Sequence, residues 1–337
     1  MNKRRSVLYI GIDVHEKESQ LAVLEKEGSL LLEKRIPTKE ISSFLSSLPG
    51  EKQVAMESLG FIYPIHEKLS SLKDCTISVA NPGKVRLISG SPTKNDRNDA
   101  VILGDLLRTN YLPLAHMRDE ETREKLIVIG ERVRYGMRRG ELKQSIRWML
   151  KRKGITEAKN LFSPDGRKKL RELRLHEVDH GLDELDLIDS FIEQLDPQIA
   201  DMASKDEGAT LLDTIPGIAP YTALYLSSVL DDIDRFPDSK HACAYLGLVP
   251  WLDETADTTH LGHITKRGDK YLRKNLVECA RAAIRKDTNL KNFYTRVKRK
   301  RGDKRAIIAV ARKLVSYAYW VLKRKITYEE LSPWAGT

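Results

Sequence analysis

Residues 7–14 read VLYIGIDV, an apolar, β-branched run that carries a single carboxylate, Asp13, near its end. A run this short and this apolar predicts a strand buried on both faces, so Asp13 is expected where that strand leaves the core. Burial of an unpaired carboxylate costs free energy because the charge loses its hydration. The run therefore favours a bound cation or a basic partner at Asp13, with a strand-ending turn aspartate as the simpler alternative.

The first hundred residues continue with alternating strand and helix patterns. Two more strand-like runs follow the first, which predicts an antiparallel meander, and Thr38 is expected to cap the helix after it. A strand at 53–57, a helix at 63–72 and a strand at 76–80 come next. Three strands, a helix and then strand–helix–strand is the order of the ribonuclease H-like fold. In that fold a mixed sheet carries acidic residues at adjacent strand ends, and Glu57 ends the strand at 53–57.

A third acidic feature opens the helical pattern that begins with KNDRNDA at 94–100. Residues three apart on a helix share a face, so Asp96 and Asp99 are expected to point the same way. The helix macrodipole also favours acidic residues in a first turn, which explains either aspartate alone. Together with Asp13 and Glu57 they make four carboxylates, the oxygen ligands that a pair of Mg²⁺ ions needs for phosphate displacement.

Actin-like and sugar-kinase ATPases also have a strand that ends in Gly-Ile-Asp. They follow the aspartate with a small, Gly- and Thr-rich turn that cradles phosphates on backbone amides. Here the aspartate is followed by VHEK at 14–17. This chemistry does not suit a phosphate-binding turn, so the ATPase alternative is disfavoured.

The charge balance points to a polyanionic partner. Among 337 residues, 58 are Lys or Arg and 48 are Asp or Glu, which gives a net charge of +10 and a pI near 9.3. The basic residues gather at 132–139, 147–153 and 296–301. Any one run is explained by a solvated face, but three such runs on a basic chain favour nucleic acid.

No apolar stretch approaches the roughly 20 residues of a membrane-spanning helix, and no signal-peptide core precedes the first strand. The three cysteines, Cys75, Cys243 and Cys279, are far apart and lack paired spacing. They predict neither a disulfide framework nor a zinc site. We expect a cytoplasmic protein with no membrane partner.

The middle of the chain predicts long helices. Residues 120–153 are almost free of Gly and Pro, and a second helical stretch runs from 176 to about 204, with a break near Pro197. Long helices with modest apolar stripes pack on each other or on a second copy. We expect three segments: a catalytic domain at 1–117, a coiled-coil oligomerisation spacer at 118–207 and a C-terminal domain at 208–337. A plain helical bundle is the alternative for the spacer.

Residues 211–223 read LLDTIPGIAPYTA, a helix, a Pro-Gly turn and a helix. The pattern resembles a helix-hairpin-helix motif, whose turn offers backbone N–H groups to a DNA phosphate. Gly217 would make that contact, although Ala219 stands where the motif has its second glycine. A simple turn between two helices is the equal alternative.

Two later motifs make a family resemblance specific. GLVP at 247–250 is followed by a polar loop, by GHITKRG at 262–268 and by YLR at 271–273. This order resembles the C-terminal domain of the DEDD transposases of the insertion-sequence family numbered one hundred and ten, which includes the Piv DNA invertases. The GIDV, Glu57 and KNDRNDA motifs match that family's acidic domain, so the resemblance spans nearly the whole chain.

The resemblance implies a RuvC-like domain in which Asp13, Glu57, Asp96 and Asp99 bind Mg²⁺. It also implies a C-terminal domain whose serine hydroxyl attacks DNA and forms a covalent link. Members of the family act as multimers, so a dimer or tetramer is expected, and a non-coding bridge RNA guides them to DNA. The function implied is a DNA transposase or site-specific recombinase.

The sequence departs from the family at the nucleophile, because Thr255-Ala256 stands where the family has Ser-Gly. Threonine also carries a hydroxyl, but its methyl group crowds an in-line approach. We take Thr255 as the expected nucleophile, with Thr258, Thr259 or Ser239 as alternatives. The other possibility is a non-catalytic or repurposed DNA- or RNA-binding protein derived from such a transposase.

Basic residues near the presumed site are expected to hold phosphates. Those after the loop are Lys266, Arg267 and Arg273, and those in the densest basic run are Lys298, Arg299, Lys300 and Arg301. The aromatic residues Tyr317, Tyr319 and Trp320 are expected in the core of the last long helix.

Overall fold

The computed structural model describes residues 7–58, 60–89, 96–155, 160–255 and 258–331. For residues 89, 96–97, 252–255 and 258–261 only the backbone is described. The chain divides into two compact units, Met1–Met117 and Arg118–Thr337. Within the described ranges, no helix combines the length and apolar character needed to cross a membrane. The predicted division into 1–117, 118–207 and 208–337 stays a prediction.

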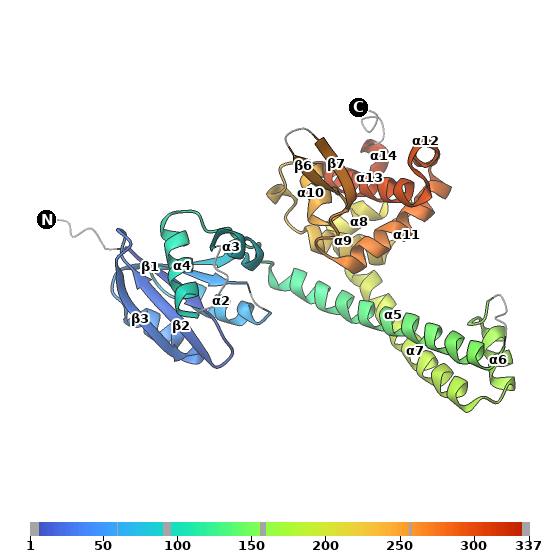
Figure 1. Cartoon of the computed structure of the whole chain (residues 1–337), viewed down its shortest axis with the longest axis horizontal. Coiled ribbons are helices and arrows are strands. Elements are labelled where there is room, and N and C mark those ends of the chain that lie inside the picture. The colour runs from blue at the N-terminus through green and yellow to red at the C-terminus, as the bar shows by residue number, and fades with distance from the viewer. Residues whose placement is uncertain (1–6, 59, 90–95, 156–159, 256–257, 332–337) are drawn as a thin grey trace. The chain divides into compact units, whose positions relative to one another are not determined.

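Unit 1 is built on a five-stranded mixed sheet with the order β3-β2-β1-β4-β5, drawn in blue in Figure 1. Strand β1 pairs antiparallel with β2 and parallel with β4, which confirms the predicted ribonuclease H-like arrangement. The strands are β1 (Val7–Asp13), β2 (Glu18–Leu24), β3 (Leu30–Pro37), β4 (Glu51–Glu57) and β5 (Cys75–Ala80). The helices of this unit are η1 (Thr38–Glu40), α1 (Ile41–Ser47), α2 (Ile62–Ser70), α3 (Pro82–Ser89) and α4 (Asp96–Arg108).

The two faces of the sheet are covered differently. Large side chains such as Ile10 and Val54 belong to the core shared with α1 and α2. Successive residues of a strand point to opposite faces, and the opposite face carries small residues against α4. A Cβ atom at Gly11 would lie 1.9 Å from the carbonyl oxygen of Ala100 and 2.5 Å from the nitrogen of Gly104. Backbone therefore lies directly on backbone where α4 crosses β1.

Helix α4 runs antiparallel to β1. The guanidinium of Arg108, its last residue, donates to the carbonyl oxygen of Lys26, just beyond the carboxyl end of β2. That end lies beside the amino end of β1, because Leu24 pairs with Tyr9. The first turn of α4 consequently lies toward the carboxyl end of β1.

The substitution Gly11→Ala is expected to destabilise unit 1 by about 1–3 kcal/mol, because the new methyl group meets main-chain atoms that no rotamer change can move. Amide hydrogen exchange of β1 and α4 in the full chain measures the effect. The control is Gly130→Ala in α5, where no atom lies within 4 Å of the new methyl group. That control gains up to about 1 kcal/mol of helix propensity. Unchanged protection of α4 in Gly11→Ala would contradict the close approach.

Unit 2 begins with two long helices that pack against each other, α5 (Glu120–Arg152) and α7 (His176–Lys205), with α6 (Pro164–Glu172) between them in the chain. Acidic residues of α7 face the basic run at 132–139. Arg132 Nε lies 2.8 Å from Asp196 Oδ1, and Arg138 pairs with Glu184. The charge of this run is thus partly neutralised within the chain, which weakens its interpretation as a nucleic-acid surface.

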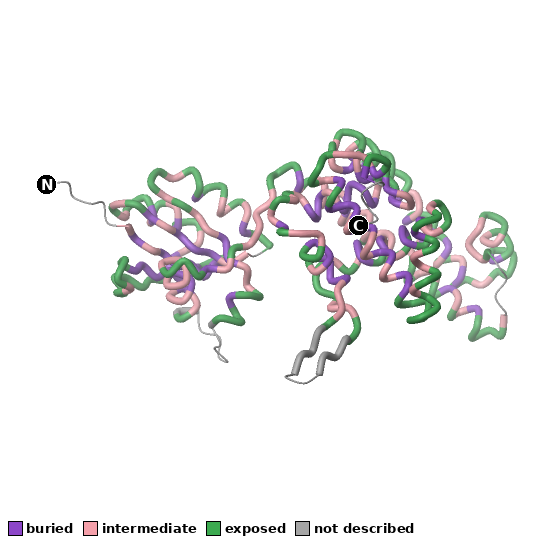
Figure 2. The backbone as a smooth tube through the Cα atoms, turned by 90° about the horizontal axis from the view of Figure 1, so that it is seen from above, coloured by how far each residue is buried: buried purple, intermediate pink, exposed green. Residues whose placement is uncertain are grey.

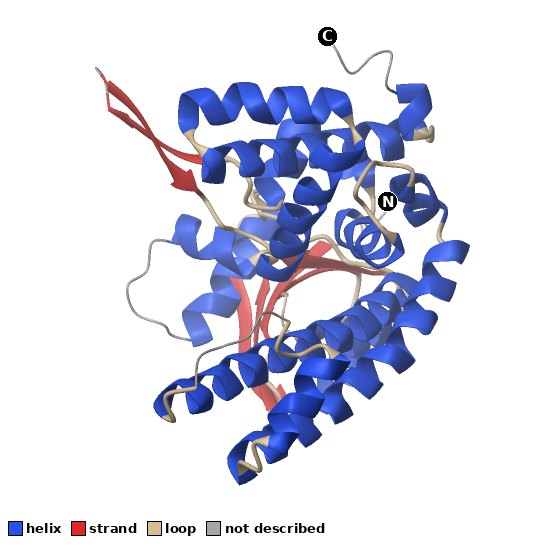
Figure 3. Ribbon diagram, turned by 90° about the vertical axis from the view of Figure 1, so that its right-hand side faces the viewer, coloured by secondary structure: helices blue, strands red, loops and turns tan. Residues whose placement is uncertain are grey.

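The remaining elements form one helical body around α13, whose inner face is buried along its length. Figure 2 colours buried residues purple along the whole backbone. A two-stranded antiparallel hairpin of β6 and β7 projects from the helices, as Figure 3 shows. The elements are α8 (Glu207–Asp213), α9 (Pro220–Leu230), η2 (Ile233–Arg235), α10 (Ser239–Tyr245), β6 (Pro250–Thr255), β7 (Thr258–Ile264), α11 (Lys270–Lys286), α12 (Thr288–Arg301), α13 (Asp303–Arg324) and α14 (Tyr328–Leu331).

The aromatic residues of α13 differ in burial. Tyr317 and Tyr319 are 6% and 2% exposed, as a core position requires. Trp320 is 36% exposed, so its assignment to the core was wrong. It follows Tyr319 by one residue, and one step along a helix turns the side chain by about 100°.

Candidate functional site

Two predicted carboxylates end neighbouring strands of unit 1. Ile12 of β1 pairs with Met56 of β4 in a parallel register, so Asp13 and Glu57 follow at the same edge of the sheet. Neighbouring strands lie about 4.8 Å apart. Asp13 is two residues after Gly11 and therefore shares its face, the one covered by α4.

The carboxylate of Asp13 is nearly buried. The residue is 8% exposed, and its Oδ2 lies 3.1 Å from His15 Nε2. Glu57 is partly buried and follows Ala55, which packs with Leu103 of α4. Both acidic residues thus belong to the face of the sheet on which α4 lies.

The other two predicted ligands belong to the first turn of α4. Asp96 begins the helix, and its side chain lies outside the described residues. Asp99 is partly buried and immediately precedes Ala100, which contacts Gly11. The structure therefore brings the start of α4 to the strand edge that carries Asp13 and Glu57.

The described side chains do not by themselves complete a metal site. Among them, no group of three or more His, Cys, Asp or Glu residues stands close enough to hold a metal ion. The donor chemistry still fits a hard divalent cation, because Asp13 presents a carboxylate at a nearly buried strand end and hard cations take oxygen ligands. The full set of four carboxylates stays a prediction.

The predicted nucleophile lies in the β6–β7 hairpin of unit 2. Thr255 ends β6 and pairs with Thr258, the first residue of β7, while Thr259 pairs with Glu254. The side chains of these threonines, and the whole of Ala256, lie outside the described residues. The alternative Ser239 begins α10, where its hydroxyl accepts a hydrogen bond from Ser316 Oγ at 3.1 Å.

The base of the hairpin is fastened to the helices by main-chain hydrogen bonds. Thr265 N–H donates to the carbonyl oxygen of Val249 at 2.9 Å, and Lys266 N–H donates to that of Gly247 at 3.2 Å. A Cβ atom at Gly247, which has φ +68°, would lie 2.1 Å from the carbonyl oxygen of Arg267. Lys266 and Arg267 are exposed here, where basic side chains can meet phosphates.

Arg273 differs from this arrangement. It is 9% exposed, and its Nη1 donates to the carbonyl oxygens of Leu246, at 3.2 Å, and of Arg267. Burial lowers the pKa of this guanidinium from its ordinary value. Its position gives the predicted phosphate contact no support, because the guanidinium of Arg273 bonds to carbonyl oxygens of the turn and lies away from solvent.

Packing within the chain also accounts for Gly217. It has φ +86°, and a Cβ atom there would lie 2.5 Å from the carbonyl oxygen of Cys279 and 2.6 Å from the nitrogen of Ala283. The close approach that requires glycine is thus to α11 of the same chain. The turn before α9 packs in the core and offers no support for a phosphate contact at Gly217.

The densest basic run forms the exposed end of α12 beside the base of the hairpin. Lys298, Arg299, Lys300 and Arg301 are all exposed. Arg301 lines a pocket of about 810 Å³ together with Pro250 and Ile264. Hydrogen bonds from Tyr294 and Lys298 hold the pKa of Asp303, which also lines this pocket, below its usual range. Arg305 and Arg312 of α13 extend the basic lining, and sequence reasoning missed Arg312.

Comparison with protein families gives two matches along the chain. A profile described as Transposase IS116/IS110/IS902 family matches residues 209–295. A second profile, described as Transposase and named for the DEDD domain of these elements, matches residues 10–154. The matched regions together include the acidic edge of unit 1 and the hairpin of unit 2.

Curated relatives resemble the chain over most of its length. A transposase for insertion sequence element IS1328 from Yersinia enterocolitica is 28% identical over 83% of this chain and 85% of its own. A transposase for IS1111A from Coxiella burnetii is 26% identical over 97% of this chain and 93% of its own. A pilin gene-inverting protein from Moraxella lacunata is 24% identical over 75% of this chain and 74% of its own.

Proposed function

Because the chain belongs to the IS116/IS110/IS902 family of transposases, enzymes of DNA phosphoryl transfer, we propose that it cuts and rejoins DNA through a threonine hydroxyl. Thr255 of the β6–β7 hairpin is the proposed nucleophile. Its hydroxyl would lose a proton to a base and form an ester with a DNA phosphorus, while the bond from that phosphorus to a deoxyribose oxygen breaks and a DNA hydroxyl leaves. Asp13, Glu57, Asp96 and Asp99 are the proposed Mg²⁺ ligands. The observation that carries the proposal is that the carboxyl ends of β1 and β4 and the first turn of α4 lie at the same edge of the sheet.

The proposed ligands match the chemistry of the reaction. A divalent cation bound by carboxylates supplies positive charge to the oxygens of a phosphate displacement. The nearly buried position of Asp13 keeps its carboxylate fixed at the strand end, beside His15. A threonine hydroxyl is a weak nucleophile until a base or a lowered pKa activates it.

The chain's exposed basic residues are proposed to hold the DNA backbone. Lys266 and Arg267 follow the hairpin and are exposed. The end of α12 lies beside the base of the hairpin, because Arg301 lines the same pocket as Pro250 and Ile264. Lys and Arg at such positions fix the register of a duplex without reading its sequence. This arrangement suits an enzyme whose target is selected by another component.

The proposal also includes a guide RNA, an oligomeric state and a cellular location. A bridge RNA as the guide is supported by the net charge of +10, which suits a second polyanion. A homodimer or homotetramer is supported by the exposed Ile127 and Trp148 of α5, which suit a contact with a second copy. A cytoplasmic location agrees with Cys75, Cys243 and Cys279, which form no disulfide in the described part of the chain.

The test uses the full chain with DNA that carries the ends of its own element. Cleavage and a covalent protein–DNA adduct on a denaturing gel are expected with Mg²⁺ and are expected to disappear with EDTA. Binding without cleavage under every metal condition would favour the non-catalytic alternative. That alternative arises because Thr255-Ala256 stands where the family has Ser-Gly.

The double change Arg299→Gln and Arg301→Gln is expected to weaken DNA binding about equally for all sequences. Each lost phosphate contact lowers the slope of log affinity against log salt by about 1. Fluorescence anisotropy at several salt concentrations measures both quantities. Arg138→Gln is the matched control, because Arg138 already pairs with Glu184. An equal effect of the control would show that general charge, not this site, is being measured.

A further inference from the structure

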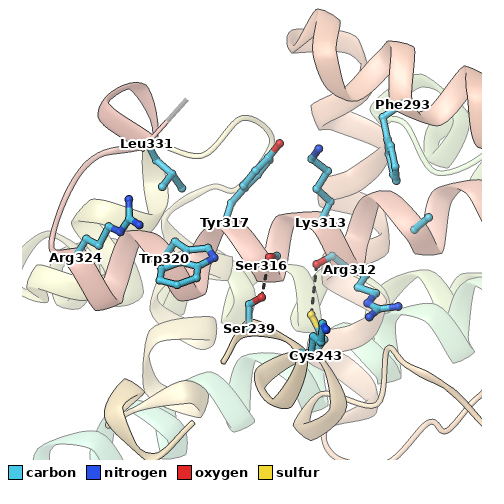
Figure 4. Close-up of a pocket in the computed structure, with 12 residues that line it drawn as sticks. Ser239, Cys243, Phe293, Arg312, Lys313, Ser316, Tyr317, Trp320, Arg324 and Leu331 are labelled. Atoms are coloured by element: carbon cyan, nitrogen blue, oxygen red, sulfur yellow. Dashed lines mark hydrogen bonds between the residues drawn. The ribbon is translucent and has the colours of Figure 1, made fainter. Parts of the chain in front are cut away.

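A second pocket of unit 2, which we call the α13 pocket, is lined mostly by residues that have no role assigned so far. It has a volume of about 650 Å³, within the range of about 300–1,000 Å³ that is typical of ligand sites. Figure 4 shows side chains of α10, α12, α13 and α14 around it, with Trp320 and Arg324 at one end and Arg312 toward the other.

The charge of the α13 pocket is of one sign. Four of its lining residues are basic: Lys240, Arg312, Lys313 and Arg324. No acidic side chain lines it among the residues that the structure describes. In the pairing of α5 with α7, by contrast, acidic residues lie opposite arginines. A pocket with four cations and no carboxylate favours an anion as its occupant.

The polar groups of the pocket suit phosphate oxygens. The hydroxyls of Ser239 and Ser316 lie 3.1 Å apart and both line the wall. Cys243 also lines it, but burial raises the pKa of this thiol to about 11. It therefore stays neutral and adds no competing negative charge at neutral pH.

Aromatic rings supply the second half of the chemistry. Trp320 is 36% exposed although its neighbour Tyr319 is buried. The guanidinium of Arg324 lies 4.9 Å from the centre of the Trp320 ring. The ammonium of Lys313 lies 5.1 Å from the ring of Phe293. Rings interleaved with cations are the usual means of binding unpaired nucleotides, because every base has a face that can stack.

The α13 pocket adjoins the pocket at the base of the hairpin. Ala309 and Arg312 line both of them. Arg312 and Trp320 are eight residues apart on α13, which is about 12 Å along the helix axis. A strand whose phosphate lies at the hairpin base can therefore reach Trp320 by following one helix.

We propose that the α13 pocket binds an unpaired nucleotide of the DNA strand held at the β6–β7 hairpin, with its base on Trp320 and its phosphate among Lys240, Arg312 and Lys313. A base that loses its pairing partner during strand exchange also loses stacking energy, and the pocket offers it an aromatic surface in exchange. The identity of the strand as DNA rests on the proposed function.

The test measures binding of the full chain to fluorescent single-stranded DNA by anisotropy in EDTA. Trp320→Leu is expected to lower the affinity about tenfold, the loss of one base-stacking contact. Trp320→Phe is expected to restore most of the affinity, because it restores an aromatic face. Tyr111→Leu is the control, since Tyr111 is an aromatic residue that is 75% exposed in unit 1 and has no role in either proposal. Blunt duplex DNA should show no difference between the variants.

Photocrosslinking gives a readout that a merely structural role of Trp320 would not move. DNA with iodouracil in its single-stranded part is expected to crosslink to the peptide that contains Trp320, and Arg312→Gln is expected to reduce the yield. Free nucleoside triphosphate and RNA of the same sequence are tested beside the DNA. An effect of Trp320→Leu on either of these with unchanged affinity for DNA would overturn the proposal, as would equal affinity of all variants for DNA.

The two proposals can fail separately. Binding is measured without Mg²⁺, so loss of strand cleavage does not affect the result for the α13 pocket. Conversely, intact binding by Trp320→Leu would remove the pocket from the mechanism and leave cleavage through Thr255 standing.

Discussion

Asp13→Asn is expected to lower Mg²⁺-dependent cleavage of element DNA by about 1,000-fold or more, while the chain stays folded. Asparagine keeps the shape of the side chain at this nearly buried position but removes the negative charge that a divalent cation requires. A factor of 1,000 corresponds to about 4 kcal/mol of transition-state stabilisation, within what a bound metal supplies. Cleavage rates on denaturing gels across a Mg²⁺ titration measure the loss.

The control for this prediction is Asp105→Asn. Asp105 belongs to the last turns of α4, the end remote from Asp13, where it accepts hydrogen bonds from Arg108. Its loss costs a partly exposed ion pair, worth about 1 kcal/mol or less, and should leave cleavage near the level of the parent chain. Gel-shift binding to DNA should be similar for both variants. Full cleavage by Asp13→Asn would remove the acidic edge from the proposed site.

Thr255→Ala is expected to abolish the covalent protein–DNA adduct. Alanine has no hydroxyl, so no ester with phosphorus can form at this position. Thr255→Ser is expected to keep the adduct and to form it at least as fast, because the change removes the methyl group that crowds an in-line approach. Denaturing gels of labelled DNA, followed by protease digestion and peptide mass measurement, identify the adduct and its site.

Two other hydroxyl variants serve as controls for Thr255. Thr259→Ala removes a hydroxyl from the same hairpin, opposite Glu254 in the strand pair, and Ser239→Ala removes one from α10 that already bonds to Ser316. Both are expected to keep the adduct. If the adduct survives in Thr255→Ala and disappears in either control, the nucleophile has been assigned to the wrong residue.

The architecture of unit 1 was predictable because its strands are short, apolar and in a distinctive order. The sequence places a carboxylate after each of two buried strands, and parallel pairing of those strands puts Asp13 and Glu57 at one edge. What the sequence did not show is the contact of Gly11 with Ala100. That contact joins segments far apart in the chain, and a single glycine in a strand has several possible uses.

The basic residues show where sequence reasoning loses force. A sequence gives the charge of Arg273 but not the direction of its side chain, and the structure turns it toward carbonyl oxygens. Gly217 belongs to a helix–turn–helix pattern that occurs in proteins both with and without DNA contacts at the turn, so the pattern alone does not decide its role. Arg312 lies within the apolar periodic pattern of α13, and nothing in that pattern indicates that its side chain lines two pockets.

The contact between Gly11 and Gly104 has a consequence for how precisely the acidic groups can be spaced. Strand and helix touch through their main chains there, so a change of rotamer in the surrounding side chains does not alter the gap between them. The separation between the main chains of β1 and the start of α4 is consequently set by this contact and not by side-chain packing. Repacking of surrounding hydrophobic side chains during evolution can proceed without retuning that separation.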